Sequence, residues 1–373
     1  PSLVGSDAFT GALTRTAGEN TGTYAIGQGS LSAGSNYTIA YVSRDFAITA
    51  KPITVTADAS QNKVYGTSDP VFTYSVSPSL VGSDAFTGAL TRTAGENIGT
   101  YAINQGSLTA GSNYTISYAG ANFTITAKPI IVTADASQTK VYGTTDPVFT
   151  YTVSPSLVGS DAFTGTLTRT AGENIGTYAI GQGSLSAGSN YTIAYVSRDF
   201  AITAKPITVT ADASQNKVYG TADPVFTYSV SPSLISGDAF TGALARTAGE
   251  NAGTYAINQG SLSAGSNYTI AYVSKDFAIT AKPITVTADA SQNKVYGTSD
   301  PVFTYSVSPS LVGSDAFTGA LTRTAGENTG TYAIGQGSLS AGSNYTIVYV
   351  SKDFAITAKP ITVTADASQN KVY

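Results

Sequence analysis

Lys63 and Glu96 are the residues whose types could form a covalent bond without a cofactor. A lysine buried beside an acid can condense with an Asn or Asp side chain into an isopeptide bond, losing one ammonia or one water, and Glu96 could assist. Both groups would have to be buried, and burying an unpaired charge is costly. We therefore favour a simpler interpretation. In it, Lys63 is solvated and Glu96 accepts backbone N–H bonds at the start of the strand that holds Tyr101.

Asp69 and Asp84 lie in turn-forming sequences and could bind Ca²⁺ between loops. Ca²⁺ takes six to eight oxygen ligands, usually from several carboxylates close in sequence. Each of these acids stands alone, and the chain has no D-x-D-x-D run. An isolated Asp in a turn more often bonds to its own backbone. We expect structural acids and no metal or other cofactor.

The composition excludes several classes of enzyme. The chain of 373 residues has no His, Cys, Met or Trp, which rules out His- or Cys-based triads, thiolate chemistry and zinc sites with nitrogen or sulfur ligands. It has no G-x-x-x-x-G-K-[ST] phosphate loop. Glycosidase chemistry needs paired carboxylates flanking a cleft, and isolated acids do not indicate one. We predict no enzyme, and no catalytic, cofactor-binding or metal-binding residues.

The net charge of −4 argues against a nucleic-acid partner, because such proteins carry basic patches. No run approaches the length of about 18 apolar residues that a membrane span needs, so we predict none. Two motifs suggest sugars. Tyr74, Tyr101, Tyr114 and Tyr118 could stack on sugar rings, but they lie in phase with apolar core positions. Five Asn-Tyr-Thr sequons are better explained as turns leading into strands: Asn36, Asn113, Asn190, Asn267 and Asn344.

The sequence repeats every 77 residues without insertion or deletion. Pro-Ser-Leu recurs at Pro1, Pro78, Pro155, Pro232 and Pro309. Units that open at Lys-Pro give a truncated repeat 1–50, complete repeats 51–127, 128–204, 205–281 and 282–358, and a truncated repeat 359–373. Both ends fall inside a unit, so we expect a segment of a longer polypeptide. Most solenoid repeats are about 20–50 residues long. We therefore predict separate small domains, with a continuous β-solenoid as the alternative.

Alternating apolar and polar residues predict strands within each unit. In repeat 51–127 these cover residues 53–57, 63–65, 72–76, 86–92, 101–103, 114–118 and 123–127. No helical period occurs. The pattern predicts an all-β, seven-stranded, Ig-like β-sandwich. The run from Glu96 through Gly99 to Tyr101 is similar to a tyrosine corner, in which the hydroxyl reaches a backbone group.

The junction between units has no Gly/Ser linker. Lys128-Pro129 follows the last predicted strand of one unit and leads into the first strand of the next. Proline fixes its own φ and biases the preceding residue to an extended conformation. We therefore predict a stiff, rod-like array.

These strings resemble the MBG-type repeats of large bacterial surface proteins. The resemblance rests on Lys51-Pro-Ile-Thr-Val-Thr-Ala57, Val64-Tyr65-Gly66 with Asp69-Pro70, Gly95-Glu96 with Gly99-Thr-Tyr101, Asn113-Tyr-Thr-Ile116 and Phe123-Thr-Ile125. It implies tandem β-rich modules of secreted adhesins or surface fibres, often stalks, and no catalytic residues.

We therefore predict an extracellular structural array at the bacterial cell surface, the stalk or shaft of an adhesin or filament. Its expected partners are neighbouring repeats and copies of itself. Outward strand positions carry mostly Thr and Ser, and each complete repeat has a net charge of only −1. Such surfaces repel one another weakly, which suggests lateral association. The alternative function is a multivalent array whose repeated weak sites contact glycans or surfaces.

Overall fold

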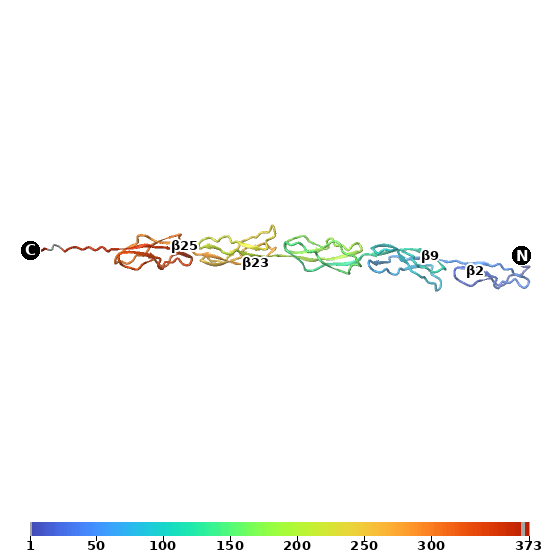
Figure 1. Ribbon diagram of the computed structural model, residues 1–373. Coiled ribbons are helices and arrows are strands. Elements are labelled where there is room, and N and C mark those ends of the chain that lie inside the picture. The colour runs from blue at the N-terminus through green and yellow to red at the C-terminus, as the bar shows by residue number, and fades with distance from the viewer. Residues whose placement is uncertain (1, 367–369, 373) are drawn as a thin grey trace. The chain divides into compact units, whose positions relative to one another are not determined.

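The computed structural model describes residues 2–366 and 370–372, and within them it consists of strands and loops. The all-β prediction is confirmed (Figure 1). Pro1 of the truncated repeat 1–50, and residues 367–369 and 373 of the truncated repeat 359–373, lie outside the described residues. No helix long and apolar enough to span a membrane occurs in the described part of the chain.

The chain forms two compact units. One extends to Gln138 and also holds Pro147–Gly172 and Thr177–Phe200, and the other holds Thr139–Asp146, Glu173–Gly176 and the chain from Ala201 onward. Every contact described below lies within one of these units.

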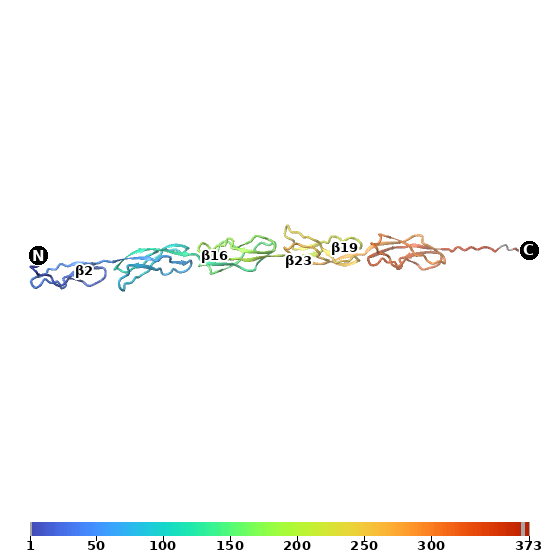
Figure 2. The same ribbon diagram turned by 180° about the vertical axis from the view of Figure 1, so that it is seen from behind.

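The strands recur with the 77-residue period (Figures 1 and 2). Each complete repeat opens with the longest strand: β4 (Lys51–Ala57), β11 (Lys128–Ala134), β18 (Lys205–Ala211) and β25 (Lys282–Ala288). A short strand follows: β5 (Asn62–Val64), β12 (Gln138–Val141), β19 (Gln215–Val218) and β26 (Asn293–Val295). Next come β6 (Tyr74–Ser77), β13 (Tyr151–Ser154), β20 (Tyr228–Ser231) and β27 (Tyr305–Ser308).

The second half of a repeat begins with a two-residue strand: β1 (Thr14–Arg15), β7 (Thr91–Arg92), β14 (Thr168–Arg169), β21 (Ala245–Arg246) and β28 (Thr322–Arg323). It continues with β2 (Gly22–Gly27), β8 (Gly99–Asn104), β15 (Gly176–Gly181), β22 (Gly253–Asn258) and β29 (Gly330–Gly335). Then follow β9 (Tyr114–Ala119), β16 (Tyr191–Val196), β23 (Tyr268–Val273) and β30 (Tyr345–Val350). The last strands are β3 (Arg44–Ile48), β10 (Asn122–Thr126), β17 (Arg198–Thr203), β24 (Lys275–Thr280) and β31 (Lys352–Thr357).

Two sheets form within repeat 51–127. The three-stranded sheet has the order β6-β4-β9, and the four-stranded sheet has the order β5-β10-β8-β7. Strand β4 runs antiparallel to β6 and parallel to β9, while β10 runs parallel to β5 and antiparallel to β8. This order differs from the ABED and CFG sheets of constant-type immunoglobulin domains. Each described sheet takes its strands from a single repeat, which is contrary to the continuous β-solenoid considered as the alternative.

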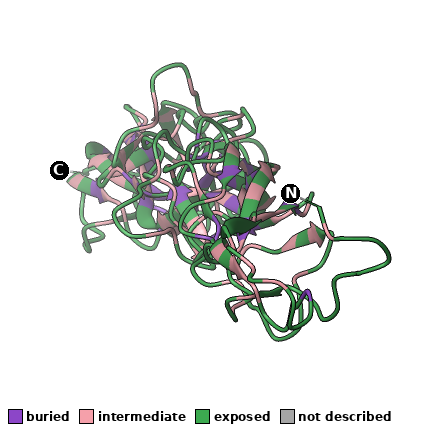
Figure 3. Cartoon of the chain, turned by 90° about the vertical axis from the view of Figure 1, so that its right-hand side faces the viewer, coloured by how far each residue is buried: buried purple, intermediate pink, exposed green. Residues whose placement is uncertain are grey.

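The hydrophobic core lies between these two sheets. Ile53 and Val55 of β4 meet Ile103 of β8 and Phe123 and Ile125 of β10 in one buried cluster. Burial alternates along β4 and β10, as expected for strands with one face on a core. Figure 3 shows the buried residues within the strands and mostly exposed loops around them. The alternation read from the sequence therefore identified the core-facing residues.

One predicted strand is much shorter than expected. Residues 86–92 form only the two-residue strand β7, preceded by an isolated bridge between Thr87 and Thr109. Gly88, which lies between Thr87 and β7, has φ +76°, and a Cβ atom there would lie 2.1 Å from the carbonyl oxygen of Ser107. The positive φ interrupts the extended strand. Both this conformation and the close backbone approach require glycine.

Candidate functional site

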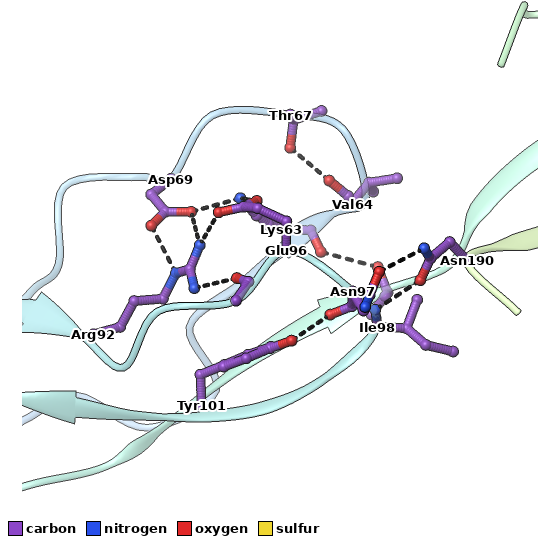
Figure 4. A network of polar contacts seen from close by, with 12 residues as sticks. Lys63, Val64, Thr67, Asp69, Arg92, Glu96, Asn97, Ile98, Tyr101 and Asn190 are labelled. Atoms are coloured by element: carbon purple, nitrogen blue, oxygen red, sulfur yellow. Dashed lines mark hydrogen bonds and ion pairs between the residues drawn. The ribbon is translucent and has the colours of Figure 1, made fainter. Parts of the chain in front are cut away.

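Four charged side chains form a closed ring at one end of repeat 51–127 (Figure 4). Lys63 Nζ lies 2.7 Å from Asp69 Oδ1 and 2.5 Å from Glu96 Oε2. Arg92 contacts the same two acids, with Nε 2.7 Å from Asp69 Oδ2 and an Nη atom 2.5 Å from Glu96 Oε1. The charges balance within the ring, and each cation touches both acids. We call these residues the charge ring.

The two cations of the charge ring are buried, and the acids face water. The side chains of Lys63 and Arg92 are 4% and 6% exposed, whereas those of Asp69 and Glu96 are 34% and 64% exposed. The sequence-based interpretation of Lys63 as solvated, with Glu96 bonded to backbone N–H groups, is therefore wrong. Lys63 is the middle residue of β5 and faces the core side of its sheet, so its side chain is buried.

Proximity alone does not make Lys63 reactive. Hydrogen bonds from Lys63 and Arg92 lower the pKa of Glu96, and those from Arg92 and Lys63 lower the pKa of Asp69. Burial alone would lower the pKa of Lys63, but its hydrogen bonds to Asp69 and Glu96 outweigh this effect and raise it. Condensation to an isopeptide requires a neutral amine and a neutral acid. The ring stabilises the ionised forms of both, so its geometry supports an ion-pair network.

Aromatic rings hold the arginine of the charge ring in place. The Arg92 guanidinium carbon lies 5.2 Å from the Tyr101 ring centre and 5.4 Å from that of Phe123, within the range of cation–π attraction. Tyr101 Oη donates a 2.8 Å hydrogen bond to the backbone oxygen of Asn97, four residues upstream. The hydroxyl contact expected of this tyrosine is thus present, although its ring is only half buried.

Asp84, the second calcium candidate, accepts a 2.6 Å hydrogen bond from Tyr114 Oη, and the backbone N–H of Val81 donates to the same hydroxyl at 2.8 Å. Tyr114 itself is buried, in agreement with its expected core position. The structure therefore does not bring Asp69 and Asp84 together, because they serve different contacts. No group of three or more potential metal-ligating side chains occurs in residues 2–366 and 370–372.

A second polar cluster joins repeat 51–127 to repeat 128–204. Tyr65, directly after β5, donates from Oη to Asp161 Oδ2 at 2.9 Å, and Tyr191 Oη donates to the same oxygen at 2.6 Å. The two tyrosine rings meet edge to face, 5.4 Å apart. The contacts recur as Tyr142 with Asp238 and Tyr268, and as Tyr219 with Asp315 and Tyr345. We call this arrangement the tyrosine joint.

The tyrosine joint changes the ionisation of its members. The hydrogen bond to Asp161 raises the pKa of Tyr65, and the hydrogen bonds from Tyr191 and Tyr65 lower the pKa of Asp161. The joint is therefore matched to one protonation state, with neutral tyrosines and an ionised aspartate.

Four of the sequon asparagines bind across boundaries between repeats. Asn190 Oδ1 accepts a 2.9 Å hydrogen bond from the Ile98 backbone N–H, and its Nδ2 donates to Asn97 Oδ1 at 2.9 Å (Figure 4). Asn113, Asn267 and Asn344 contact the preceding repeat in the same way. The predicted turn before a strand is present, since β9 begins at Tyr114, but the side chain is also an inter-repeat clasp.

Gly66 completes the boundary. It has φ +81°, and a Cβ atom there would lie 2.4 Å from Val158 Cγ2 of the next repeat. Gly220 meets Val312 at the same distance, and Gly143 meets Ile235 at 2.5 Å. A side chain at these glycines would therefore push the neighbouring repeat away.

The charge ring lies next to the asparagine contacts with the following repeat, and Figure 4 shows both. Lys63 precedes Tyr65 by two residues, and Glu96 precedes Asn97 and Ile98. The ring thereby links the two chain segments that present the contacts to the next repeat. Sequence reasoning missed this boundary. The recurring signal was a Tyr-Gly pair placed after a strand whose inward residue is lysine.

An all-β tandem array whose repeats meet through recurring side-chain contacts is the class of protein that this structure defines. A model of the MBG domain family (YGX type) matches residues 1–47, 53–124, 130–201, 207–278 and 284–355. The chain belongs to this family, and the resemblance inferred from its strings is confirmed. Tyr-Gly pairs stand at 65–66, 142–143, 219–220 and 296–297. No curated protein matches the chain.

Proposed function

We propose that the chain is a non-enzymatic structural array, the stalk or shaft of a bacterial surface adhesin or filament outside the cell. One observation carries this proposal: successive repeats are held together by the same side-chain contacts. Within each unit, the tyrosine joint, the asparagine clasp and the glycine contact recur at the boundaries. A multidomain protein with mobile linkers would not need such contacts. A load-bearing shaft would.

The short connection between repeats supports the same proposal. Only Ala127 separates β10 from β11, and Lys128 and Pro129 are already part of β11. A one-residue connection between two hydrogen-bonded strands restricts rotation. We propose that the repeats are seven-stranded β-sandwich domains, Ig-like in their two-layer architecture but not in strand order, bounded as 51–127, 128–204, 205–281 and 282–358, and that they form a stiff rod.

Electron microscopy of the full chain tests this function. We expect straight particles with an axial repeat of about 35–45 Å, one small β domain per repeat. The substitutions Asn113→Ala, Asn190→Ala, Asn267→Ala and Asn344→Ala together should make the particles bend. The control carries the same Asn→Ala change at Asn62, Asn216 and Asn293, whose side chains form hydrogen bonds within their own repeat. Flexible particles for the unmodified chain would contradict the proposal.

A recurring surface hollow favours the alternative, a multivalent binding array. In repeats 205–281 and 282–358 it is lined by an Asp-Pro-Val-Phe segment and by the residues around the arginine of the charge ring. The valine of this segment is exposed in all four complete repeats, at Val71, Val148, Val225 and Val302. Binding of the full chain to a glycan array, lost when these four valines are replaced by serine, would support this function. Equal binding by both proteins would exclude the hollow as the site.

A further inference from the structure

Each complete repeat has four edge strands, and they are not equivalent. In repeat 51–127 they are β6 and β9 of one sheet and β5 and β7 of the other. An edge strand exposes backbone N–H and C=O groups that can pair with another chain. Proteins commonly prevent such pairing with short strands, inward-pointing charges or nearby prolines.

Three of these edges carry such a feature. Strand β5 has three residues and an inward-pointing lysine, Lys63. Strand β7 has two residues and ends at Arg92 of the charge ring, whose side chain is buried. Strand β6 has four residues and is followed directly by Pro78. These edges are poor templates for a further strand.

The fourth edge has none of these features. Strand β9 is six residues long and contains no charged residue and no proline, and the same holds for β16, β23 and β30. We call the outer sides of these four strands the neutral edge. Lys51 N–H donates to Asn113 O at 2.8 Å, and backbone groups of alternate residues point to opposite sides of a strand. The N–H and C=O groups of Ile116 and Tyr118 therefore point away from β4.

The outer face beside the neutral edge is also uncharged. Its side chains are Thr54 and Thr56 of β4 and Thr115, Ser117 and Ala119 of β9. Lys51, at the start of β4, bonds through Nζ to the Ser79 backbone oxygen. In other repeats some exposed positions of these strands are apolar: Ile131, Val196, Val273, Val348 and Val350. In repeats 128–204, 205–281 and 282–358 the last strand of the four-stranded sheet instead exposes a pair of charges, as at Lys275 and Asp276.

We propose that the neutral edge pairs with the neutral edge of a second copy of this chain, so that arrays associate side by side through added β-sheet. Main-chain pairing supplies the contact, and the uncharged face lets the two copies approach closely. The same edge recurs every 77 residues, and another copy has the same recurrence, so many weak contacts add up. This inference goes beyond the proposed stalk, which needs no lateral contact.

The test compares two variants of the full chain with identical changes in net charge. The edge variant carries Thr115→Lys, Thr192→Lys, Thr269→Lys and Thr346→Lys, exposed positions in the neutral-edge strands. The control variant carries Thr100→Lys, Thr177→Lys, Thr254→Lys and Thr331→Lys, exposed positions in the four-stranded sheet. Circular dichroism checks that both fold, and static light scattering measures their mass against concentration.

We expect the measured mass of the unmodified chain and of the control variant to rise with concentration to about twice the monomer mass or more. The mass of the edge variant should stay at that of the monomer. An unmodified chain that remains monomeric at high concentration overturns the proposal. So does an edge variant that associates like the control. Should the edge variant not fold, hydrogen exchange of the unmodified chain decides. The Ile116 and Tyr118 amides must become protected as concentration rises, and unchanged exchange would refute the pairing. None of these outcomes alters the case for the stalk.

Discussion

Tyr65 Oη donates a hydrogen bond to Asp161 Oδ2 across 96 residues of sequence. The donor follows the second strand of one repeat, and the acceptor lies in a loop of the next. The same acceptor oxygen also receives the hydroxyl of Tyr191. One carboxylate therefore connects the end of one repeat to the core strand of its neighbour, and it does so with groups whose charge depends on pH.

Replacing Gly66 by Ala should destabilise the boundary more than replacing Gly297 by Ala. The two glycines have nearly the same positive φ, 81° and 85°, so both variants bear the backbone cost of about 1–2 kcal/mol. Only Gly66 faces Val158 at 2.4 Å, whereas no atom lies within 4 Å of the Cβ position at Gly297. Thermal unfolding of the two full-length variants measures the difference. Equal losses would show that the boundary contact contributes nothing.

Lys63→Met should destabilise repeat 51–127 by about 1–2 kcal/mol. Removing one partner of a fully buried ion pair costs about 3–5 kcal/mol, but water screens Glu96 and Asp69, which are 64% and 34% exposed. Lys51→Met is the control, since its Nζ contacts an exposed backbone oxygen and such changes stay within about 0.5 kcal/mol. Hydrogen exchange of the β5 and β10 amides reports the local stability. An unchanged rate in Lys63→Met would mean that the charge ring is energetically neutral.

Acid should weaken repeat 51–127 through the charge ring. The folded-state pKa values of Asp69 and Glu96 are lowered, so these groups add stability above the ordinary carboxyl pKa of about 4. That stability is lost as pH falls through the lower folded-state values. The thermal midpoint, measured from neutral pH down to about pH 2, should fall steeply at the acid end. In Lys63→Met the decline should be smaller, and a steeper one would contradict this assignment.

Base should open the tyrosine joint. The pKa of Tyr65 is raised by its hydrogen bond to Asp161, and that of Tyr191 is raised by burial and by the same aspartate. Their contribution is complete below the ordinary tyrosine pKa of about 10 and disappears as pH rises through the folded-state values. Small-angle scattering should show greater bending of the chain at high pH. The triple variant Tyr65→Phe, Tyr142→Phe and Tyr219→Phe should bend already at neutral pH. If the triple variant stays rigid, the tyrosine hydroxyls do not limit bending between repeats.

The intact mass of the chain should equal the mass of its sequence. Each isopeptide bond between Lys63 and Asp69 would remove one water, and the charge ring stabilises both groups in ionised form. High-resolution mass spectrometry of the denatured protein measures this directly. A deficit of one water per complete repeat would show that the ring reacts despite its charges.

Local patterns were enough to predict most of the strands, and they failed at contacts between distant segments. The alternation at Ile53 and Val55 identified β4 and its buried face. The lysine at position 63 was misjudged, because its partners Asp69 and Glu96 come from separate loops that only the folded sheets bring together. The clasp of Asn190 on Ile98 spans 92 residues. No local rule relates those two positions, so the sequence predicted the turn at Asn190 but not its contact with the neighbouring repeat.

The direction of the strands determines how a repeat responds to tension. A pull on both ends of repeat 51–127 acts on β4 towards its start and on β10 towards its end. Strand β4 is paired with β9 in parallel over six residue pairs, and β10 with β5 in parallel over three. In a parallel pair the hydrogen bonds are spaced evenly along the strands. Tension along the strands therefore shears each ladder as a whole, and its bonds must break together instead of unzipping one at a time.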